Sequence, residues 1–445
     1  MKNHLQRISG SIIEGIKQEI SERLISIKID SASRFGRHIL CINAQYELNH
    51  EVMTRTLCMI EVKESQTAKF LKIQILEVLK RFNISLDQIF SITSDNGANM
   101  IAAAKKLQEQ FSTAVASDDW ANEEDVIDNT EEIMDALSVE LSDHFNIVRC
   151  ASHTLQLHCV KFRCKYQNCD GVLKKQLDEE TWQFMKEYEE AFRPMYITTK
   201  LLQAEHQAFS DFYMNWILAI RNLQSLKNNR FAAPLIQSLR NRLKMLTQNM
   251  AFKAALFLDL RFNYLNSTVL SPAEKEEVQK YLIKTWRRIQ QTKRVNPMPN
   301  GAGESISTNN EESLGDEIAD FLTEMFGGTL QTQGATADPE AQLTEQLKLL
   351  EIGERMPHDH NVWDHWIARK ATHPQLSAVA LVVLATASSQ VSVERAFSGL
   401  ALILSDLRTG LSEDTLEHIL LIKLNESLLD RILPSLTQHA LQPNT

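Results

Sequence analysis

The sequence predicts an α/β protein whose mixed β-sheet is interrupted by a long all-helical segment. Strand-like runs rich in β-branched residues come early in the chain, and short polar turns separate them. From Leu177 to Gln291 no segment has strand character, and apolar residues recur at helical spacing instead. Two further helical patterns follow near the end. With 445 residues, of which 43% are hydrophobic, the chain is long enough for two or three domains with sizeable cores.

The first elements are expected to form a three-stranded meander. Leu24–Asp30, Ile39–Leu48 and Val52–Val62 have the composition of strands, and turns this short favour antiparallel neighbours. Helix and strand then alternate, which places helices on the faces of a mixed sheet. These later elements are expected at Thr67–Phe82 (helix), Ile89–Ser94 (strand), Ala98–Phe111 (helix), Phe145–Arg149 (strand) and Ala151–Phe162 (helix).

The middle of the chain is expected to be a block of helices, and its end to add two more. Helical spacing of apolar residues predicts the middle helices at Glu180–Ala204, Ser210–Lys227, Ala233–Gln248 and Pro272–Gln291. The same spacing predicts the C-terminal helices at Gln375–Leu404 and Ser412–Leu433.

Two acidic segments account for the net charge of −10 and help to divide the chain. Residues 118–143 hold eleven acidic side chains and residues 295–346 hold ten, and neither segment contains Lys or Arg. The remaining residues carry 47 basic against 36 acidic side chains, which is compatible with a phosphate-binding face. Residues 295–346 also hold six of the fourteen glycines, a composition typical of a flexible linker.

Composition also excludes several classes of protein. No apolar run approaches the roughly 18 residues that cross a bilayer, and Met1–Ser11 has no apolar core like that of a secretory signal. Six cysteines in 445 residues are too few for a disulfide scaffold, so a reducing compartment is expected. We therefore expect a soluble, intracellular protein without a membrane partner.

Asp30 and Asp95 are the carboxylates best placed for chemistry. Each is expected at the end of a strand. If the two strands are neighbours, both side chains lie at the same edge of the sheet, where α/β proteins bind ligands. With a third carboxylate from a helix, they could hold a pair of Mg²⁺ ions for phosphoryl transfer. The alternative is structural, because Asp95-Asn96-Gly97 also has the composition of a helix N-cap and turn, and Asp30 with Ser31 that of a strand-end turn.

Three motifs, in this order, resemble hAT-superfamily transposases. Residues 92–107 (ITSDNGANMIAAAKKL) resemble the segment that carries the second aspartate of the family, and residues 149–157 (RCASHTLQL) resemble its Cys-x-x-His segment. Residues 363–399, which include VSVERAFSG, and residues 405–425 resemble the C-terminal dimerisation region of the family. The resemblance spans most of the chain, and the combination of motifs is more specific than any one of them.

The resemblance implies an RNase H-like fold with a helical insertion and C-terminal helices that form a dimerisation region. It places the acidic triad of the family on Asp30, Asp95 and Glu394. These carboxylates would bind Mg²⁺ or Mn²⁺, which activate the nucleophiles that cut and join DNA at transposon ends. Cys150 and His153 would have a structural role near this site. No zinc is expected there, because the cysteine spacing fits no known finger. The resemblance also implies a nuclear protein.

Two features of the family are missing from the sequence. Only 23 residues precede the first expected strand and they contain no cysteine, whereas active members carry an N-terminal zinc finger of the BED type that finds DNA. The chain also lacks the tryptophan motif that follows the Cys-x-x-His segment in the family. These departures favour a truncated or domesticated member, and a separate zinc-finger-bearing partner would have to supply DNA targeting.

Two surfaces are expected to carry interactions. The C-terminal region is expected to serve both the core and dimerisation, through Trp363, Trp366, Arg395, Phe397, Leu416 and Leu420. Basic residues of the helical block could neutralise DNA phosphates, or they could simply be solvated helix faces. These residues are Arg221, Lys227, Arg230, Arg240, Arg242, Lys244, Lys253, Arg287, Arg288, Lys293 and Arg294.

Two functions therefore remain open. The favoured one is a transposase-derived protein that forms a homodimer or higher homo-oligomer and associates with DNA. The other is a working metal-dependent DNA transposase with an Asp-Asp-Glu triad. The expected parts are an N-terminal helical lead-in (1–23), the first part of the RNase H-like domain (24–165), a helical insertion (166–294), an acidic linker (295–346), the C-terminal core and dimerisation region (347–435) and a tail (436–445).

Overall fold

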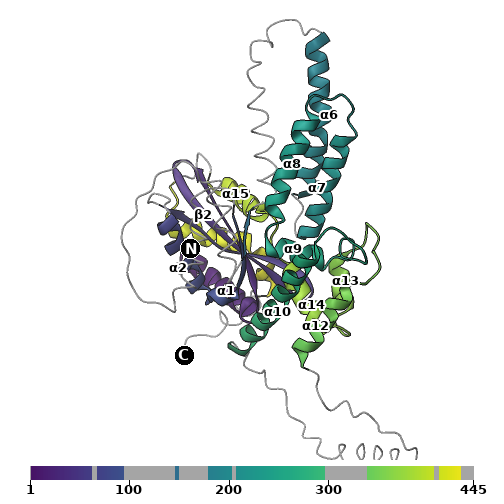
Figure 1. Ribbon diagram of the computed structural model, residues 1–445. Helices are drawn as coiled ribbons and strands as arrows, with labels where there is room; N and C mark the ends of the chain where they lie inside the picture. The colour runs from purple at the N-terminus through teal and green to yellow at the C-terminus, as the bar shows by residue number, and fades with distance from the viewer. Residues whose placement is uncertain are drawn as a thin grey trace, which may run out of the picture.

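A sheet with helices on both faces lies beside a tall helical bundle (Figure 1). The computed structural model describes residues 2–62, 68–94, 146–149, 179–202, 207–295, 338–404 and 410–431. The helices predicted at 98–111 and 151–162 and the acidic segment 118–143 lie outside these residues. Within the described ranges, no helix is both long and apolar enough to span a membrane.

Five strands form one mixed sheet in the order β3-β2-β1-β4-β5. β1 (Ile25–Arg34), β2 (Arg37–Leu48) and β3 (Glu51–Val62) form an antiparallel meander, as predicted. β4 (Ile89–Ser94) then lies parallel to β1, and β5 (Asn146–Arg149) lies parallel to β4. The predicted end of the first strand at Asp30 is wrong, because antiparallel pairing with β2 continues to Arg34. The parallel pairing of β1 with β4 does stop at Ile29.

The two faces of the sheet differ in polarity. Ile25, Ile27 and Ile29 of β1 point into an apolar core that α1 (Lys2–Ile20) and α2 (Ala68–Arg81) share. A short 3₁₀ turn, η1 (Leu86–Gln88), leads from α2 into β4. Since side chains alternate along a strand, Ser26, Lys28 and Asp30 lie on the opposite face. Residues of the C-terminal region cover that face.

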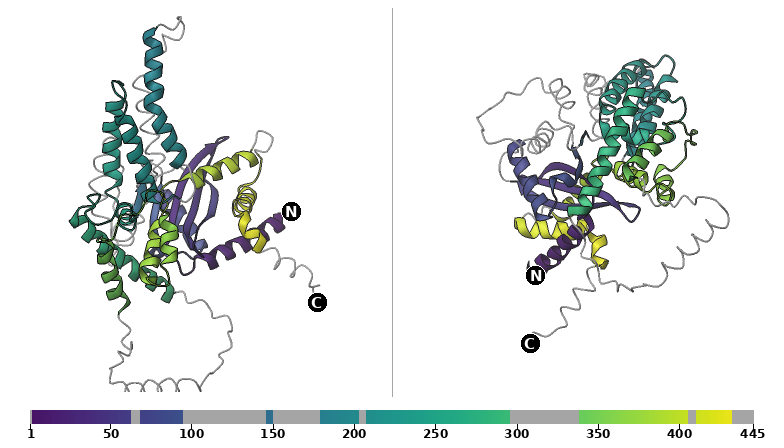
Figure 2. Two further views of the ribbon diagram at one scale, coloured as in Figure 1. Left: turned by 90° about the vertical axis from the view of Figure 1, so that its right-hand side faces the viewer. Right: turned by 60° about the horizontal axis from the view of Figure 1, so that its bottom comes forward.

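The C-terminal helices attach to the sheet at two places. α15 (Val391–Ile403) packs Val393, Ala396 and Leu400 against residues of β2 and β3. α16 (Glu413–Leu424) lies along the edge strand β3 and against α1, so helices from the two ends of the chain are neighbours (Figure 2).

The single helix predicted over 375–404 is wrong. The structure has α14 (Pro374–Leu384) and α15, with a connection between them that contains Thr386, Ser388, Ser389 and Gln390. Polar contacts explain the break. Gln45 Nε2 donates to the carbonyl oxygen of Ala385 at 2.8 Å, and Thr93 Oγ1 donates to that of Ala387 at 2.7 Å. These backbone oxygens therefore bond to side chains of the sheet and not to N–H groups of a continuous helix.

The helical bundle consists of α6 (Glu179–Leu202), α7 (Phe209–Gln224) and α8 (Ala232–Leu246), which the sequence predicted (Figures 1 and 2). The short α9 (Met250–Phe257) was not predicted, because Lys253 is its one polar residue and its apolar residues show no helical periodicity. α10 (Pro272–Val295) returns to the sheet, where Asn146 Nδ2 of β5 donates to Tyr281 Oη at 2.7 Å.

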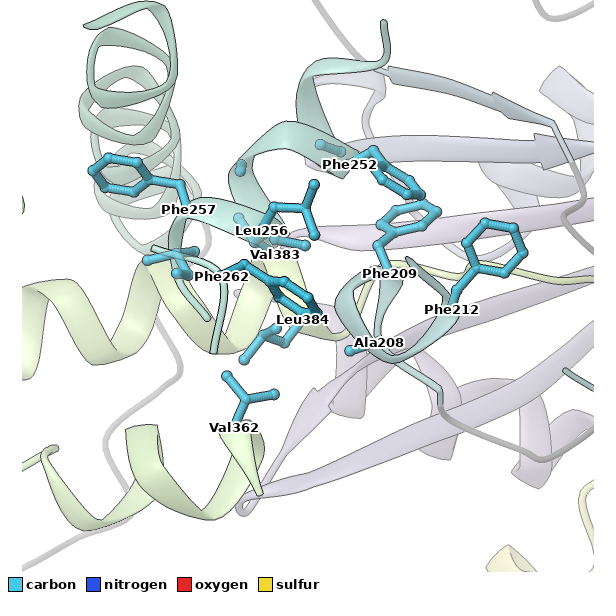
Figure 3. Packing of buried hydrophobic residues seen from close by; sticks show 14 of the residues in the cluster. Ala208, Phe209, Phe212, Phe252, Leu256, Phe257, Phe262, Val362, Val383 and Leu384 are labelled. Carbon is cyan, nitrogen blue, oxygen red and sulfur yellow. The ribbon is translucent and has the colours of Figure 1, made fainter. Parts of the chain in front are cut away.

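One large core joins the bundle to the C-terminal region. Phe209, Phe212 and Phe252 pack on one another, and Leu256 lies beside Val383 of α14 (Figure 3). The two remaining helices of this core are α12 (Pro339–Leu350) and α13 (Val362–Ala368).

α12 begins inside the predicted linker 295–346. Asp338 caps it by accepting a hydrogen bond from the backbone N–H of Glu340 at 3.2 Å. Its residues Leu343, Leu347 and Leu350 are buried. The acidic composition of the region conceals this short apolar stripe, which recurs at helical spacing.

Candidate functional site

Asp30 lies on the covered face of β1, directly opposite Cys41 of β2. It is half-buried, and its Oδ1 accepts a hydrogen bond from the backbone N–H of Ser31 at 2.8 Å. Burial raises the pKa of the Cys41 thiol well above its usual value, and electrostatic interactions with Cys58 and Asp30 raise it further. Asp30 therefore lies on the covered face of the sheet, beside a fully buried thiol.

The second aspartate follows β4 at once. Ser94, the last residue of β4, pairs with Ile29, so this strand ends beside Asp30. Asp95 itself lies outside the described residues, and so do Cys150 and His153.

Glu394 lies in the first turn of α15 and is half-buried. Its backbone N–H donates to the carbonyl oxygen of Gln390 at 3.1 Å. The side-chain Nε2 of Gln390 in turn donates to the carbonyl oxygen of Ile29 and, at 3.4 Å, to that of Thr93. The start of the helix that carries Glu394 is thus fastened to β1 and β4 where their mutual pairing stops.

A second contact holds the same helix on the polar face. Ser392 Oγ accepts hydrogen bonds from Lys28 Nζ at 3.0 Å and from Asn43 Nδ2 at 3.2 Å. Lys28 and Asn43 are register partners on β1 and β2 and both are buried. The polar residues of this face therefore bind the first turn of α15.

Carboxylate oxygens are the ligands that Mg²⁺ and Mn²⁺ prefer, so Asp30 and Glu394 fit a divalent metal by their chemistry. Among the residues that the structure describes, no group of three or more His, Cys, Asp or Glu side chains could hold a metal ion. A triad at this place would need Asp95 as its third member.

The predicted dimerisation and core residues of the C-terminal region lie mostly inside the chain. Trp366 is fully buried and donates through Nε1 to the carbonyl oxygen of Leu258 at 3.0 Å. Leu416 and Leu420 are buried in the core between α15, α16 and the sheet. Trp363 is half-buried and donates to the carbonyl oxygen of His50 at 2.8 Å.

The remaining two predicted residues of this region lie on α15 beside Glu394. Arg395 is exposed, and Phe397 is half-buried against the core that α15 and α16 share with the sheet. Of the six predicted residues, only the Arg395 side chain is mainly on the surface.

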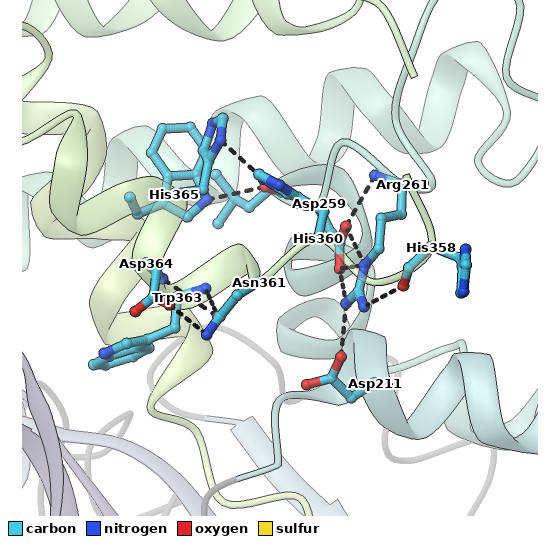
Figure 4. Close-up of polar contacts among 11 residues, drawn as sticks. Asp211, Asp259, Arg261, His358, His360, Asn361, Trp363, Asp364 and His365 are labelled. Atoms are coloured by element: carbon cyan, nitrogen blue, oxygen red, sulfur yellow. Dashed lines mark hydrogen bonds and ion pairs between the residues drawn. The ribbon is translucent and has the colours of Figure 1, made fainter. Parts of the chain in front are cut away.

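The structure reveals a buried ionic cluster that the sequence did not suggest (Figure 4). Arg261 donates to Asp259 Oδ1 through Nε at 2.9 Å and to Asp211 Oδ1 through Nη2 at 2.7 Å. Burial lowers the pKa of Arg261, but hydrogen bonds to Asp259 and Asp211 outweigh it and raise the net pKa. Asp211 and Arg261 are far apart in sequence, so the sequence gives no sign of their contact. Only the pairing of Asp259 with Arg261 has a local signal, the Asp-x-Arg pattern at 259–261.

Two histidines lie next to this cluster. His360 Nε2 and His365 Nδ1 are 3.0 Å apart, and the two rings meet edge to face. A cavity of about 750 Å³ opens here, and its lining includes Arg261, His360 and Trp363.

The basic residues predicted on the helical block have different surroundings. Arg230 pairs with Glu187, Lys253 with Glu274, and Arg287 with Glu340. Three others line a cavity of about 630 Å³ between α7 and α8 and make no ion pair in the described part of the chain; they are Arg221, Arg240 and Lys244.

Comparison with known proteins identifies one region of the chain. No curated protein matches the sequence. Residues 341–426, from α12 to just beyond α16, match the family model described as the hAT family C-terminal dimerisation region. Residues 341–426 of the chain are therefore similar to the dimerisation region of hAT-family proteins.

Proposed function

We propose that this chain is a hAT-transposase-derived protein that forms homodimers through its C-terminal region and associates with DNA. The observation that carries the proposal is the match of residues 341–426 to the hAT dimerisation region. Nuclear localisation is part of the same proposal, because a DNA partner would be met there.

A small apolar surface supports a dimer contact at the start of this region. Leu349 and Ile352 at the end of α12 are 54% and 62% exposed. Leu265 is 56% exposed and lies beside them, because its backbone N–H donates to the carbonyl oxygen of Gly353 at 3.0 Å. We name these three residues the α12 patch. A stable interface involves many more residues than these three. We therefore assign the α12 patch to the centre of the interface, where a few apolar side chains carry most of the binding energy.

Light scattering after gel filtration at micromolar concentration tests the proposal. The wild type should have twice the chain mass of 50.8 kDa, and Leu349→Ser with Ile352→Ser should shift it to a single chain. The matched control is Ile217→Ser with Leu218→Ser, two exposed apolar residues of α7 outside the matched region, which should stay dimeric. A wild-type mass of 50.8 kDa would contradict dimerisation. A dimeric Leu349/Ile352 variant would contradict only the choice of surface.

Arg221, Arg240 and Lys244 support the proposed DNA association, because cations without an ion pair are available to phosphates. Replacing all three with Gln should weaken binding to duplex DNA and reduce the slope of log affinity against log salt by roughly 3. Fluorescence anisotropy between 50 and 200 mM salt measures this slope. Replacing Lys2, Lys280 and Arg287, which are already ion-paired at the surface, should change it less.

A second candidate function is a metal-dependent DNA transposase with an RNase H-like core. The strand order β3-β2-β1-β4-β5 supports such a core, and the Gln390 contacts that fasten α15 beside Asp30 support an acidic triad of Asp30, Asp95 and Glu394. Mg²⁺ or Mn²⁺ bound there would activate the attacking oxygen and stabilise charge on the phosphoryl group.

Plasmid nicking in Mg²⁺ and in Mn²⁺ tests this second candidate. The wild type should nick, and Glu394→Gln, which keeps the shape of the side chain but not its charge, should not. Equal nicking by the two proteins would show that Glu394 has no part in it.

A further inference from the structure

The cavity of about 630 Å³ lies between α7 and α8, which are neighbours in the helical bundle (Figure 1). The charged part of its lining is exposed and consists of Arg221 on α7 and Arg240 and Lys244 on α8. The apolar part includes Ile220 and Leu256, which are buried. The other apolar residues of the lining are Ile217, Leu243, Val269 and Leu270. The cavity therefore has cations at its mouth and an apolar floor.

Tyr213 of α7 adds an aromatic ring to this lining. The ring meets those of Phe252 and Phe262 edge to face, with centroids 6.3 and 5.2 Å apart. Tyr213 is itself half-buried, so these contacts hold its ring in a defined position. An apolar surface that is already ordered loses little side-chain freedom when a ligand binds to it.

The charges of the lining favour an anionic ligand. Arg240 and Lys244 are one turn apart on α8, where like charges destabilise a helix slightly. Among the described residues the lining holds one carboxylate, that of Glu274. It already accepts a hydrogen bond from Ser271 Oγ at 2.8 Å and pairs with Lys253 at 3.1 Å. An anion bound at the mouth would therefore reduce the repulsion among the cations without facing an unpaired carboxylate.

A ligand that has both an anionic group and a flat apolar group fits this lining. Duplex DNA presents phosphates to the exposed cations, but its bases stay stacked inside the helix and leave the apolar floor unfilled. A single strand presents both phosphates and bases, and bases stack readily on aromatic side chains. Gln224 and Thr247 of the same lining carry groups that can hydrogen-bond to the edge of a base.

We propose that this cavity binds an unpaired nucleotide of single-stranded DNA. The base lies against Tyr213 and the apolar floor, and the phosphate lies near Arg221, Arg240 and Lys244. The inference rests on the proposed association with DNA and specifies the form of DNA for which the cavity is selective. Stacking of one base on an aromatic side chain changes affinity by about 5- to 150-fold.

Fluorescence anisotropy of the full chain at constant salt tests the role of the base. The probes are a short thymidine strand and an abasic strand of the same length, which keeps the phosphates and lacks the bases. The wild type should bind the thymidine strand at least about fivefold more tightly than the abasic strand. This comparison needs no variant, so it does not depend on how a substitution affects folding.

Tyr213→Leu locates the base, because it keeps the apolar character of the side chain and removes the ring. It should weaken binding of the thymidine strand by about 5- to 150-fold and leave binding of the abasic strand and of duplex DNA nearly unchanged. Tyr264→Leu is the matched control. Tyr264 is also half-buried and lies outside the lining, where the guanidinium of Arg355 is 5.3 Å from its ring centroid. Thermal unfolding confirms that both variants are folded.

The outcomes separate this inference from the association with DNA on which it rests. Equal binding of the thymidine and abasic strands would overturn the nucleotide site and leave the phosphate contacts in place. A preference for the thymidine strand that Tyr213→Leu does not reduce would overturn the choice of this cavity. Failure of the wild type to bind duplex DNA or either strand would overturn the association with DNA, and the nucleotide site with it.

Discussion

The side chain of Asn425 pairs with both backbone groups of Thr56. The Thr56 N–H donates to Asn425 Oδ1 at 3.0 Å, and Asn425 Nδ2 donates to the Thr56 carbonyl oxygen at 2.9 Å. Thr56 belongs to β3, which is the edge of the sheet, and Asn425 ends α16. The carboxamide thus takes the place of a neighbouring peptide group on an edge that could otherwise pair with another strand.

Asn425→Leu should destabilise the protein, because it leaves the buried N–H and C=O of Thr56 without partners. The expected loss is about 2–4 kcal/mol in the free energy of unfolding, measured by urea denaturation. Asn241→Leu on the exposed face of α8 is the control and should change stability by less than about 0.5 kcal/mol. Equal effects would show that the contact with Thr56 contributes little.

Glu19 connects three parts of the chain and should make the free energy of unfolding depend on pH. It accepts hydrogen bonds from Arg55 at 2.8 and 3.1 Å and from Tyr46 at 2.6 Å, and it pairs with Arg431 at 2.9 Å. Burial raises its pKa, but the hydrogen bonds and charges of Arg55, Tyr46 and Arg431 outweigh burial and the net pKa lies below 4.5. Its contribution is therefore present above about pH 4.5 and lost as the pH falls through the folded pKa.

Glu19→Gln at pH 7 should cost about 3–5 kcal/mol, because it leaves the buried Arg55 without its carboxylate. The difference in unfolding free energy between this variant and the wild type should become smaller below about pH 4.5. Urea unfolding at a series of pH values would measure it. Glu14→Gln on the same helix breaks only an exposed pair with Lys17 and should cost less than about 1 kcal/mol. A difference in unfolding free energy that does not depend on pH would contradict a stabilising role for the ionised Glu19.

The sequence was informative where local pattern decides structure. β-Branched runs separated by short turns predicted the meander of β1 to β3, and helical spacing predicted α6, α7, α8 and α10. The break between α14 and α15 was missed although the connection is polar, because the contacts that fix it come from Gln45 and Thr93, which are 340 and 294 residues away in the chain.

The candidate site was predictable only in part for the same reason. Asp30 and Glu394 were identified by a strand pattern and a family motif, and both lie in the described structure. Gln390 had no such signal, since a glutamine before a helix is ordinary until its two carbonyl partners are known. Arg261 was also missed, because its partner Asp211 is 50 residues away in the sequence.

His365 should make the C-terminal region sensitive to mild acid. Burial and, to a smaller extent, the charges of Arg369 and His360 lower its pKa to about 4, while Asp259 has the opposite effect. An unfolded chain takes up this proton near pH 6.5, whereas the folded chain does not until about pH 4, so stability should fall as the pH drops through this window.

The expected loss from His365 is about 2–3 kcal/mol between pH 6.5 and pH 4, because each unit of pKa shift corresponds to about 1.4 kcal/mol. His365→Leu should remove this part of the slope in a plot of unfolding free energy against pH. If the two proteins had parallel plots over the window, titration of His365 would not be the cause.

Two arginine–carboxylate pairs of different burial allow a direct comparison. Arg261 is buried and pairs with Asp259 at 2.5 Å, and Asp259 itself has no exposed surface. Arg287 pairs with Glu340 at the surface of α10 and α12.

Arg261→Met should cost about 3–5 kcal/mol, because it leaves the carboxylate of Asp259 buried without its cation. Arg287→Met removes a hydrated pair and should cost less than about 1 kcal/mol in the same urea experiment. Similar costs for the two variants would mean that water reaches Asp259 once Arg261 is gone, so that the cluster in Figure 4 is less enclosed than its contacts indicate.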